Sequence, residues 1–129
     1  MHGALPFLWV GLGGLIGSLC RYGFTLLLSS QPGTPWGTLA SNLAGCLVIG
    51  MVSQLAADTE FLSPTVRLFL ATGFCGGFTT LSSLVYELVQ MVRAGEWLHA
   101  MLYLNGTFFG AVLAFLLGIM MIKTLVKIG

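Results

Sequence analysis

A run of glycine and hydroxyl residues lies inside a long apolar segment. It reads Gly73-Phe74-Cys75-Gly76-Gly77-Phe78-Thr79-Thr80-Leu81-Ser82-Ser83. Each glycine costs a helix about 1 kcal/mol relative to alanine, and hydroxyl groups surrounded by lipid must find hydrogen-bond partners. The run therefore predicts a break near the middle of a membrane helix, with backbone carbonyls freed from helical hydrogen bonds. Such breaks are where membrane proteins bind ions.

Further polar side chains recur at helical spacing in the other apolar segments. Thr38 and Asn42 are four residues apart and share a helix face, as do Tyr103 and Thr107. A side-chain amide supplies two N–H donors and one acceptor, so Asn42 is either a hydrogen-bond link between helices or a donor offered to an ion. A polar ladder across the membrane would comprise Thr38, Asn42, Thr80, Ser83, Tyr103 and Thr107.

Two charged residues stand out within apolar segments. Arg21, near the end of the first, either extends to the lipid headgroups or supplies positive charge to an anion vestibule or an ion pair. Glu87 is the one acid well inside an apolar run, and the simplest interpretation is a buried carboxylate partnered by Arg21 or by a hydroxyl. Proton-coupled transporters usually need intramembrane acids or histidines, so this shortage of acids favours a passive path.

The remaining reactive residues point to no enzyme. Cys20, Cys46 and Cys75 lie far apart in apolar runs, where we expect small buried apolar side chains and neither a disulfide framework nor a zinc site. The sequence has no nucleophile–base arrangement, phosphate loop or carboxylate pair. A formal net charge of +1 offers no basic field for nucleic acid.

The elements that must position these residues are membrane helices. The 129-residue chain is 57% hydrophobic and 7% charged, whereas soluble domains carry about 25% charged residues. Crossing a bilayer takes ~20 apolar residues, so we predict a single all-α integral membrane domain over residues 1–129, with four transmembrane helices at about 5–28, 36–57, 65–92 and 97–122. Small residues that let helices approach closely recur four positions apart at Gly13 and Gly17, Ser41 and Gly45, Gly106 and Gly110, and Ala114 and Gly118.

The charges in the connecting segments give a weak orientation signal. Four helices with short turns put both termini on one side of the membrane. Arg67, Lys123 and Lys127 would lie on that side and Arg93 on the other, which is a slight excess for the positive-inside rule. We therefore expect that the chain inserts in both orientations and forms an antiparallel dimer. Four helices are also few for enclosing a pore.

Three motifs follow one another along the chain. They are Gly13-Gly14-xx-Gly17-xxx-Arg21-Tyr22, Gly37-Thr38-Leu39-xx-Asn42-Leu43-x-Gly45, and the run from Gly73 to Thr80, followed by Glu87. In this order and at these intervals they resemble the helix signatures of the Fluc/CrcB family of bacterial fluoride channels. The resemblance covers essentially the whole chain.

The resemblance implies a dual-topology, antiparallel dimer with two narrow fluoride pores and a central structural sodium ion that is not transported. By this resemblance, backbone carbonyls of Gly76 and Thr79 from both subunits would hold the sodium. Asn42 would be the amide that contacts fluoride. The family's polar track would correspond to Thr38, Tyr103 and Thr107.

One departure from the family concerns two aromatic residues. Where the family reads Thr-Thr-Phe-Ser-Thr-Phe, this chain has leucines at Leu81 and Leu84. Leucine keeps the volume roughly but loses the electropositive ring edge of phenylalanine, so Thr80, Ser83 or retained water would have to replace the hydration of fluoride. Other ring edges are offered, at spacings that do not match, by Phe78, Phe108 and Phe109.

The sequence therefore predicts a dimeric fluoride channel of the bacterial inner membrane that exports cytoplasmic fluoride passively. The negative-inside potential would drive the anion outward by ~2.3 kcal/mol per charge per 100 mV. We expect a homodimer; the alternative is a non-conducting or paired subunit of a heterodimer, whose partner brings the phenylalanines. A small four-helix proton-coupled exporter needs a glutamate in its first helix, where this chain has only Arg21.

Overall fold

Four long apolar helices make up the part of the chain described by this computed structural model, residues 3–28 and 33–128. Each is long and apolar enough to cross a bilayer, and the four spans are Leu5–Leu28, Trp36–Asp58, Pro64–Arg93 and Trp97–Lys127. The all-helical class and the four apolar helices expected from the sequence are confirmed.

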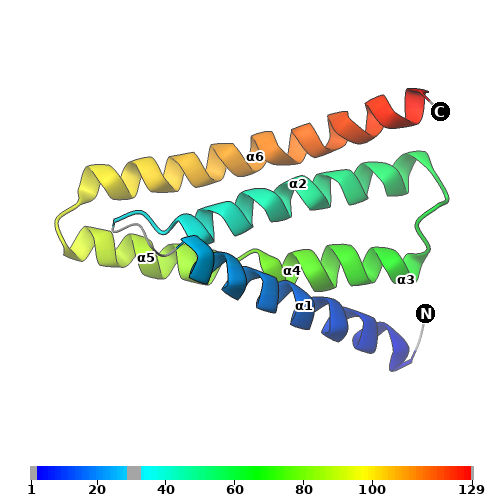
Figure 1. Cartoon of the computed structure of the whole chain (residues 1–129), viewed down its shortest axis with the longest axis horizontal. Helices are drawn as coiled ribbons and strands as arrows, with labels where there is room; N and C mark the ends of the chain where they lie inside the picture. Colours follow the sequence, from blue (N-terminus) through cyan, green and yellow to red (C-terminus); the bar gives the residue numbers. More distant parts are fainter. Residues whose placement is uncertain (1–2, 29–32, 129) are drawn as a thin grey trace.

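The third span consists of several successive elements, whereas each of the other spans is one helix (Figure 1). The elements are α1 (Leu5–Leu28), α2 (Trp36–Asp58), α3 (Pro64–Arg67), the π-helix η1 (Leu68–Cys75), α4 (Gly76–Phe78), α5 (Leu81–Arg93) and α6 (Trp97–Ile128). The last helix continues past Ile122, where the apolar segment ends, through Lys123 and Lys127.

Local sequence sets both ends of the third span. Ser63 accepts a hydrogen bond from the third helical residue and precedes Pro64, whose missing N–H costs nothing at the first helical position. At the other end Gly95 has φ +80°, a conformation that favours glycine. The Glu96 N–H then bonds the Met91 carbonyl at 2.9 Å, which is the Schellman closure of a helix and turns the chain into α6.

The two ends of the described chain lie at the same end of the bundle. Figure 1 shows both termini beside the connection from α2 to α3, whereas the turn from α5 to α6 lies at the opposite end. This arrangement follows from an even number of spans joined by short connections. It places Arg67 and Lys127 at the terminal end and Arg93 at the other, as the sequence predicts.

Glycines bring the helices into backbone contact. α1 packs against η1 and α4, and α2 packs against α6. A Cβ atom built at Gly17 would collide with the Phe74 carbonyl, and one at Gly118 would collide with the Leu47 carbonyl. The predicted close packing is confirmed at these positions. At Gly106 there is no close approach within a single subunit, since a Cβ atom would meet nothing within 4 Å.

The backbone between α4 and α5 is extended. Thr79 has φ −85° and ψ 155°, and Thr80 has φ −151° and ψ 115°. The π-helical η1 lies just before this point. π-helical turns are rare and frequently found at functional sites, and no residue type in the sequence indicates this one.

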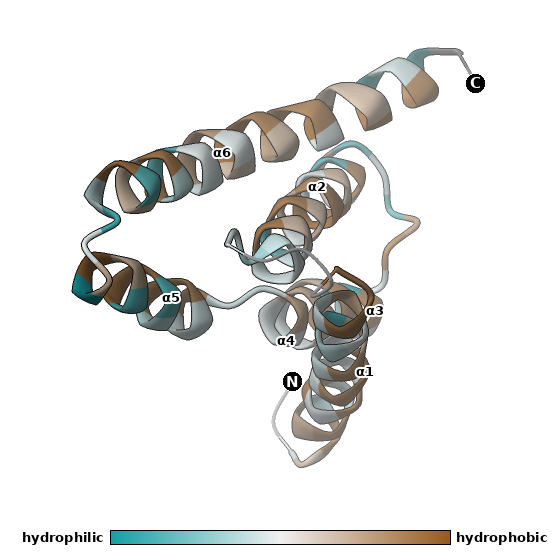
Figure 2. Ribbon diagram, turned by 60° about the vertical axis from the view of Figure 1, so that its left-hand side comes forward, coloured by the Kyte–Doolittle hydropathy of each residue, from teal (hydrophilic) through white to brown (hydrophobic). Residues whose placement is uncertain are grey.

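The centre of the bundle is partly polar, while the outer surfaces are apolar. Thr38, Ser41, Asn42 and Thr107 are buried beside an apolar cluster that includes Leu84 and Tyr103. Figure 2 shows hydrophobic residues along the helices, with hydrophilic residues concentrated on α5 and near helix ends.

The three cysteines are free and differ in exposure. Cys75 is buried and Cys46 is half-buried, as expected for small apolar side chains. Cys20 is exposed on α1, so the expectation that it is buried is wrong for a single subunit.

Candidate functional site: a polar ladder through the bundle

Two hydroxyl groups bind the carboxylate of Glu87. The Thr38 hydroxyl, on α2, donates to Oε1 at 2.6 Å, and the Tyr103 hydroxyl, on α6, donates to Oε2 at 2.7 Å. Thr38 and Tyr103 are each 5% exposed. Glu87 on α5 thus ties three spans together. A hydroxyl partner for Glu87 is confirmed, while Arg21, the alternative partner, bonds the Gly77 carbonyl instead. Glu87 was expected to be buried, but it is half-buried in the single subunit.

A second connection joins α2 to the extended segment. The Thr80 N–H donates to Asn42 Oδ1 at 2.7 Å, and Asn42 Nδ2 donates to the Thr80 carbonyl at 3.2 Å. The side-chain amide therefore pairs with both backbone groups of one residue. Asn42 links two spans, which is the first of its two expected roles.

The extended segment redirects two backbone N–H groups. In a continuous α-helix each N–H bonds the carbonyl four residues earlier. The Thr80 N–H would bond Gly76 but donates to Asn42, and the Ser83 N–H would bond Thr79 but donates to the Thr80 hydroxyl at 3.2 Å. The carbonyls of Gly76 and Thr79 thereby lose their α-helical partners.

Neighbouring carbonyls have other partners. Arg21 Nε, on α1, donates to the Gly77 carbonyl at 3.0 Å, and the Ser18 hydroxyl reaches the same oxygen at 3.5 Å. The Cys75 carbonyl accepts both the N–H and the hydroxyl of Thr79, each at 2.9 Å. Arg21 thus binds a freed carbonyl, a role that sequence reasoning missed because every carbonyl is the same in the sequence.

A cavity of about 300 Å³ opens beside this connection. Asn42, Thr107, Leu84 and Leu81 contribute to its lining, together with Phe108. Leu84 is 7% exposed and Leu81 is 74% exposed. Both leucines that replace the expected phenylalanines therefore lie at the cavity, and the ring of Phe108 lies there with them.

The other two candidate rings lie elsewhere. Phe78 is buried between Phe24 and Phe74, with ring centroids 5.3 and 5.4 Å away. Phe109 packs edge-on against Phe108 and is not among the cavity's lining residues. Of the three phenylalanines considered from the sequence, Phe108 is the one placed beside Asn42.

Two further cavities continue the polar ladder toward the α5–α6 end. One of about 270 Å³ shares Thr107 with the first and also meets Tyr103; the next, of about 230 Å³, meets Thr38 and Glu87. Thr34 lines both of these cavities. Successive cavities along the ladder are therefore neighbours that share lining residues.

Comparison with known proteins agrees with this architecture. The family model described as "CrcB-like protein, Camphor Resistance (CrcB)" matches residues 8–119. The chain belongs to the CrcB family. Its relatives span nearly the same length, and their names agree on one activity.

Relatives from three bacteria illustrate the match, and each is named "Fluoride-specific ion channel FluC". The protein of Chlorobium phaeobacteroides strain BS1 is 47% identical over 117 residues, which cover 90% of this chain and 91% of the relative. That of Chloroflexus aurantiacus is 41% identical over 112 residues, 85% and 89% of the two chains. That of Sorangium cellulosum is 39% identical over 120 residues, 92% and 94%. This CrcB chain is therefore a multi-pass bacterial membrane protein.

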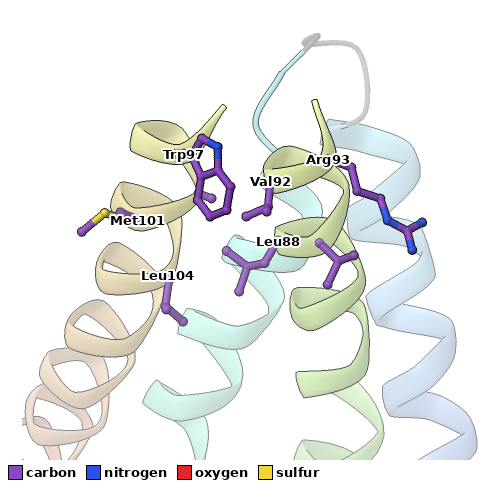
Figure 3. Close-up of a pocket in the computed structure, with 8 residues that line it drawn as sticks. Leu88, Val92, Arg93, Trp97, Met101 and Leu104 are labelled. Carbon is purple, nitrogen blue, oxygen red and sulfur yellow. The ribbon is translucent and has the colours of Figure 1, made fainter. Parts of the chain in front are cut away.

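Another hollow on this CrcB chain has a different character from the ladder. It measures about 490 Å³ and lies between α5 and α6, where Figure 3 shows Leu88, Val92, Trp97 and Leu104 around it. The guanidinium of Arg93 points away from these apolar side chains (Figure 3). This lining is almost entirely apolar, so the ladder is the better candidate pathway for an ion.

One polar cluster of the CrcB chain was missed from the sequence. His99 on α6 lies 2.8 Å from the Thr34 hydroxyl through Nε2 and 3.1 Å from Glu96 Oε2 through Nδ1. It lines the cavity of about 270 Å³ near the end of the bundle. Thr34 and Glu96 come from two connections between spans and His99 comes from α6, so no periodic pattern links them.

Proposed function

We propose that this CrcB chain forms a fluoride-selective channel, not an enzyme, through which cytoplasmic fluoride leaves a bacterium passively across its inner membrane. The polar ladder carries the proposal, because it places hydrogen-bonding side chains beside a cavity inside an otherwise apolar bundle. The names of the relatives support fluoride as that solute. No energy-coupling site is required, since the membrane potential drives the anion outward.

Asn42 is the donor that we assign to fluoride. Its Nδ2 atom carries two hydrogens, and one of them goes to the Thr80 carbonyl. Within residues 3–28 and 33–128 no acceptor takes the second hydrogen, and Asn42 lines the cavity of about 300 Å³. Fluoride is small and strongly hydrated, so a donor at this point offsets part of its lost hydration.

The hydroxyls of Thr38, Tyr103 and Thr107 have a different role, because each has a single hydrogen to donate. Thr38 and Tyr103 donate to Glu87, and Thr107 donates to the Tyr103 carbonyl at 2.8 Å. We propose that they shape the polar track and hold Glu87 in place, and that fluoride contacts them after these bonds exchange. Ser83 adds a hydroxyl on the same helix as Glu87.

The ring of Phe108 supports conduction despite the leucines at 81 and 84. It lines the same cavity as Asn42, and phenylalanine edges attract anions. We propose that Phe108 supplies the electropositive edge that Leu81 and Leu84 lack. If Phe108 does not supply this edge, the second candidate function applies, in which this chain is a paired subunit whose partner brings phenylalanines. The presence of both leucines at the cavity favours this alternative.

The extended segment at Thr79 and Thr80 is, in this proposal, the break of the third span and a cation site. Sodium suits oxygen ligands, and the carbonyls of Gly76 and Thr79 have lost their α-helical partners. These carbonyls from two antiparallel copies would hold one structural sodium. When bound, the ion supplies a fixed positive charge that favours anions nearby. Arg21 and Glu87 would set the remaining charge near the pathway.

Liposomes that contain only the purified chain test the proposal. We expect rapid fluoride release, recorded with a fluoride electrode, and no chloride release from the same vesicles. A folded dimer that releases no fluoride would exclude the homodimeric channel. Release restored by co-reconstitution with a phenylalanine-bearing CrcB protein would establish the paired subunit instead.

A further inference from the structure

The Asn42 side chain takes the place of backbone hydrogen bonds that a continuous helix would make at Thr80. Its Oδ1 takes the Thr80 N–H at 2.7 Å, and its Nδ2 satisfies the Thr80 carbonyl at 3.2 Å. Asn42 is 8% exposed in the first third of α2, and Gly45 on the same helix lies directly against the side chain of Thr79. α2 is therefore packed closely enough to fix this amide against the extended segment.

This contact concerns one of the carbonyls that lose a helical partner at the extended segment. Asn42 takes the N–H that would otherwise bond Gly76, while Arg21 and Ser18 satisfy Gly77. The surroundings of the two glycines differ as well. A Cβ atom at Gly77 would collide with the Gly14 carbonyl, whereas one at Gly76 would meet nothing within 4 Å. Gly76 therefore combines a carbonyl that lacks its α-helical partner with open space at its Cβ position.

We infer that Asn42 is a positioning residue for the cation site, in addition to its role as a donor in the pathway. Its Oδ1 holds Thr80 out of the helix and keeps the Gly76 carbonyl available, while its Nδ2 faces the anion. One side chain thereby couples the cation site to the conduction path. The inference rests on the proposed function for the identity of the cation and the anion.

Substitutions can separate the role of the amide oxygen from the role of the amide nitrogen. Asn42→Asp keeps an oxygen that accepts from the Thr80 N–H but removes the N–H donors, whereas Asn42→Ala removes both. Asn105 provides the matched control, because it is exposed on α6 and, among the residues that the structure describes, bonds only the Met101 carbonyl of its own helix. The control pair is Asn105→Asp and Asn105→Ala.

The first readout is the rise in melting temperature of the purified full chain when sodium chloride replaces choline chloride. We expect the wild type, Asn42→Asp and both Asn105 variants to keep this rise. In Asn42→Ala the sodium concentration that gives half of the rise should increase about tenfold or more, the factor for 1.4 kcal/mol of lost binding. A wild-type response in Asn42→Ala would overturn the inference, as would a wild type that does not respond to sodium.

The second readout is hydrogen exchange at the Thr80 amide, which needs no cation. We expect exchange to be faster in Asn42→Ala than in the wild type and Asn42→Asp; equal protection in all three would overturn the inference.

Fluoride efflux should be lost in both Asn42 variants. If Asn42→Ala keeps its sodium response while the wild type conducts fluoride, the inference is overturned and the channel function stands. A non-conducting wild type whose sodium response depends on Asn42 refutes the channel and supports the inference.

Thr80 provides an independent test of the same logic. Its hydroxyl takes the Ser83 N–H and so frees the Thr79 carbonyl. Thr80→Val removes the hydroxyl at nearly constant volume, and Thr80→Ser retains it. We expect the sodium response to weaken in the valine variant and to persist in the serine variant. An unchanged response in Thr80→Val would contradict the idea that redirected N–H groups build the site.

Discussion

Replacing Tyr103 by phenylalanine tests the bond between Glu87 and α6. The substitution removes the hydroxyl that donates to Glu87 Oε2 at 2.7 Å and leaves the ring in place. Tyr103 is 5% exposed, and its ring keeps the same packing in the phenylalanine variant. The loss should therefore reflect the hydrogen bond and not the packing of the ring.

The expected magnitude follows from the charge of the acceptor. A hydrogen bond to a charged group contributes about 1.5–3 kcal/mol, so we expect Tyr103→Phe to lower the free energy of unfolding by about 2 kcal/mol. This is roughly a thirtyfold change in the unfolding equilibrium constant. Adding Thr38→Val removes the remaining hydroxyl partner of Glu87. The double variant should then lose more than the sum of the single variants, because the carboxylate is left without either partner.

The assay is reversible unfolding in mixed detergent micelles, followed by tryptophan fluorescence. Tyr86→Phe is the matched control, because Tyr86 lies on α5 and is 66% exposed. We expect this control to stay within about 0.5 kcal/mol of the wild type. If Tyr103→Phe costs no more than Tyr86→Phe, the contact with Glu87 does not stabilise the bundle and the reasoning is refuted.

Further predictions concern packing and the cavity. Gly17→Ala should lower the free energy of unfolding by about 1–3 kcal/mol, because the added methyl group meets the Phe74 and Phe78 backbone; Gly23→Ala, with nothing within 4 Å, should raise it by about 0.5–1 kcal/mol. Equal effects in the same micelle assay would contradict the close approach of α1. Phe108→Leu should slow fluoride efflux from liposomes about two- to tenfold, given ~0.5–1.5 kcal/mol for an aromatic edge contact, whereas Phe109→Leu should not. If both variants conduct like the wild type, Phe108 supplies no ring edge.

The four helices were predictable because the partition of apolar and polar segments between lipid and water determines where they lie. Long runs of apolar residues require spans, and the polar turns between them require surface positions. The continuation of α6 past Ile122 was not predictable, because a helix also persists among headgroups and water. The π-helical turn at Leu68–Cys75, which packs against α1, also left no signal, because no residue type in it indicates a π-helix.

The polar ladder was predictable in its members but not in its connections. Spacing by four places Thr38 and Asn42 on one face of α2. It does not reveal that Thr38 bonds a side chain on α5 while Asn42 bonds the backbone of Thr80. Arg21 illustrates the same limit. Its charge demands a partner, but the partner is a backbone oxygen, and the pairing depends on how α1 lies against α4.

The position of both termini at one end of the bundle has a consequence for gene fusions. Two copies joined end to end by a soluble linker would be inserted with the same orientation, because the linker must stay on one side of the membrane. A single polypeptide with two opposed copies would need a linker that itself crosses the bilayer once, which takes ~20 apolar residues. A tandem gene with such a crossing linker fixes the opposed arrangement, and one with a soluble linker forbids it within a single product.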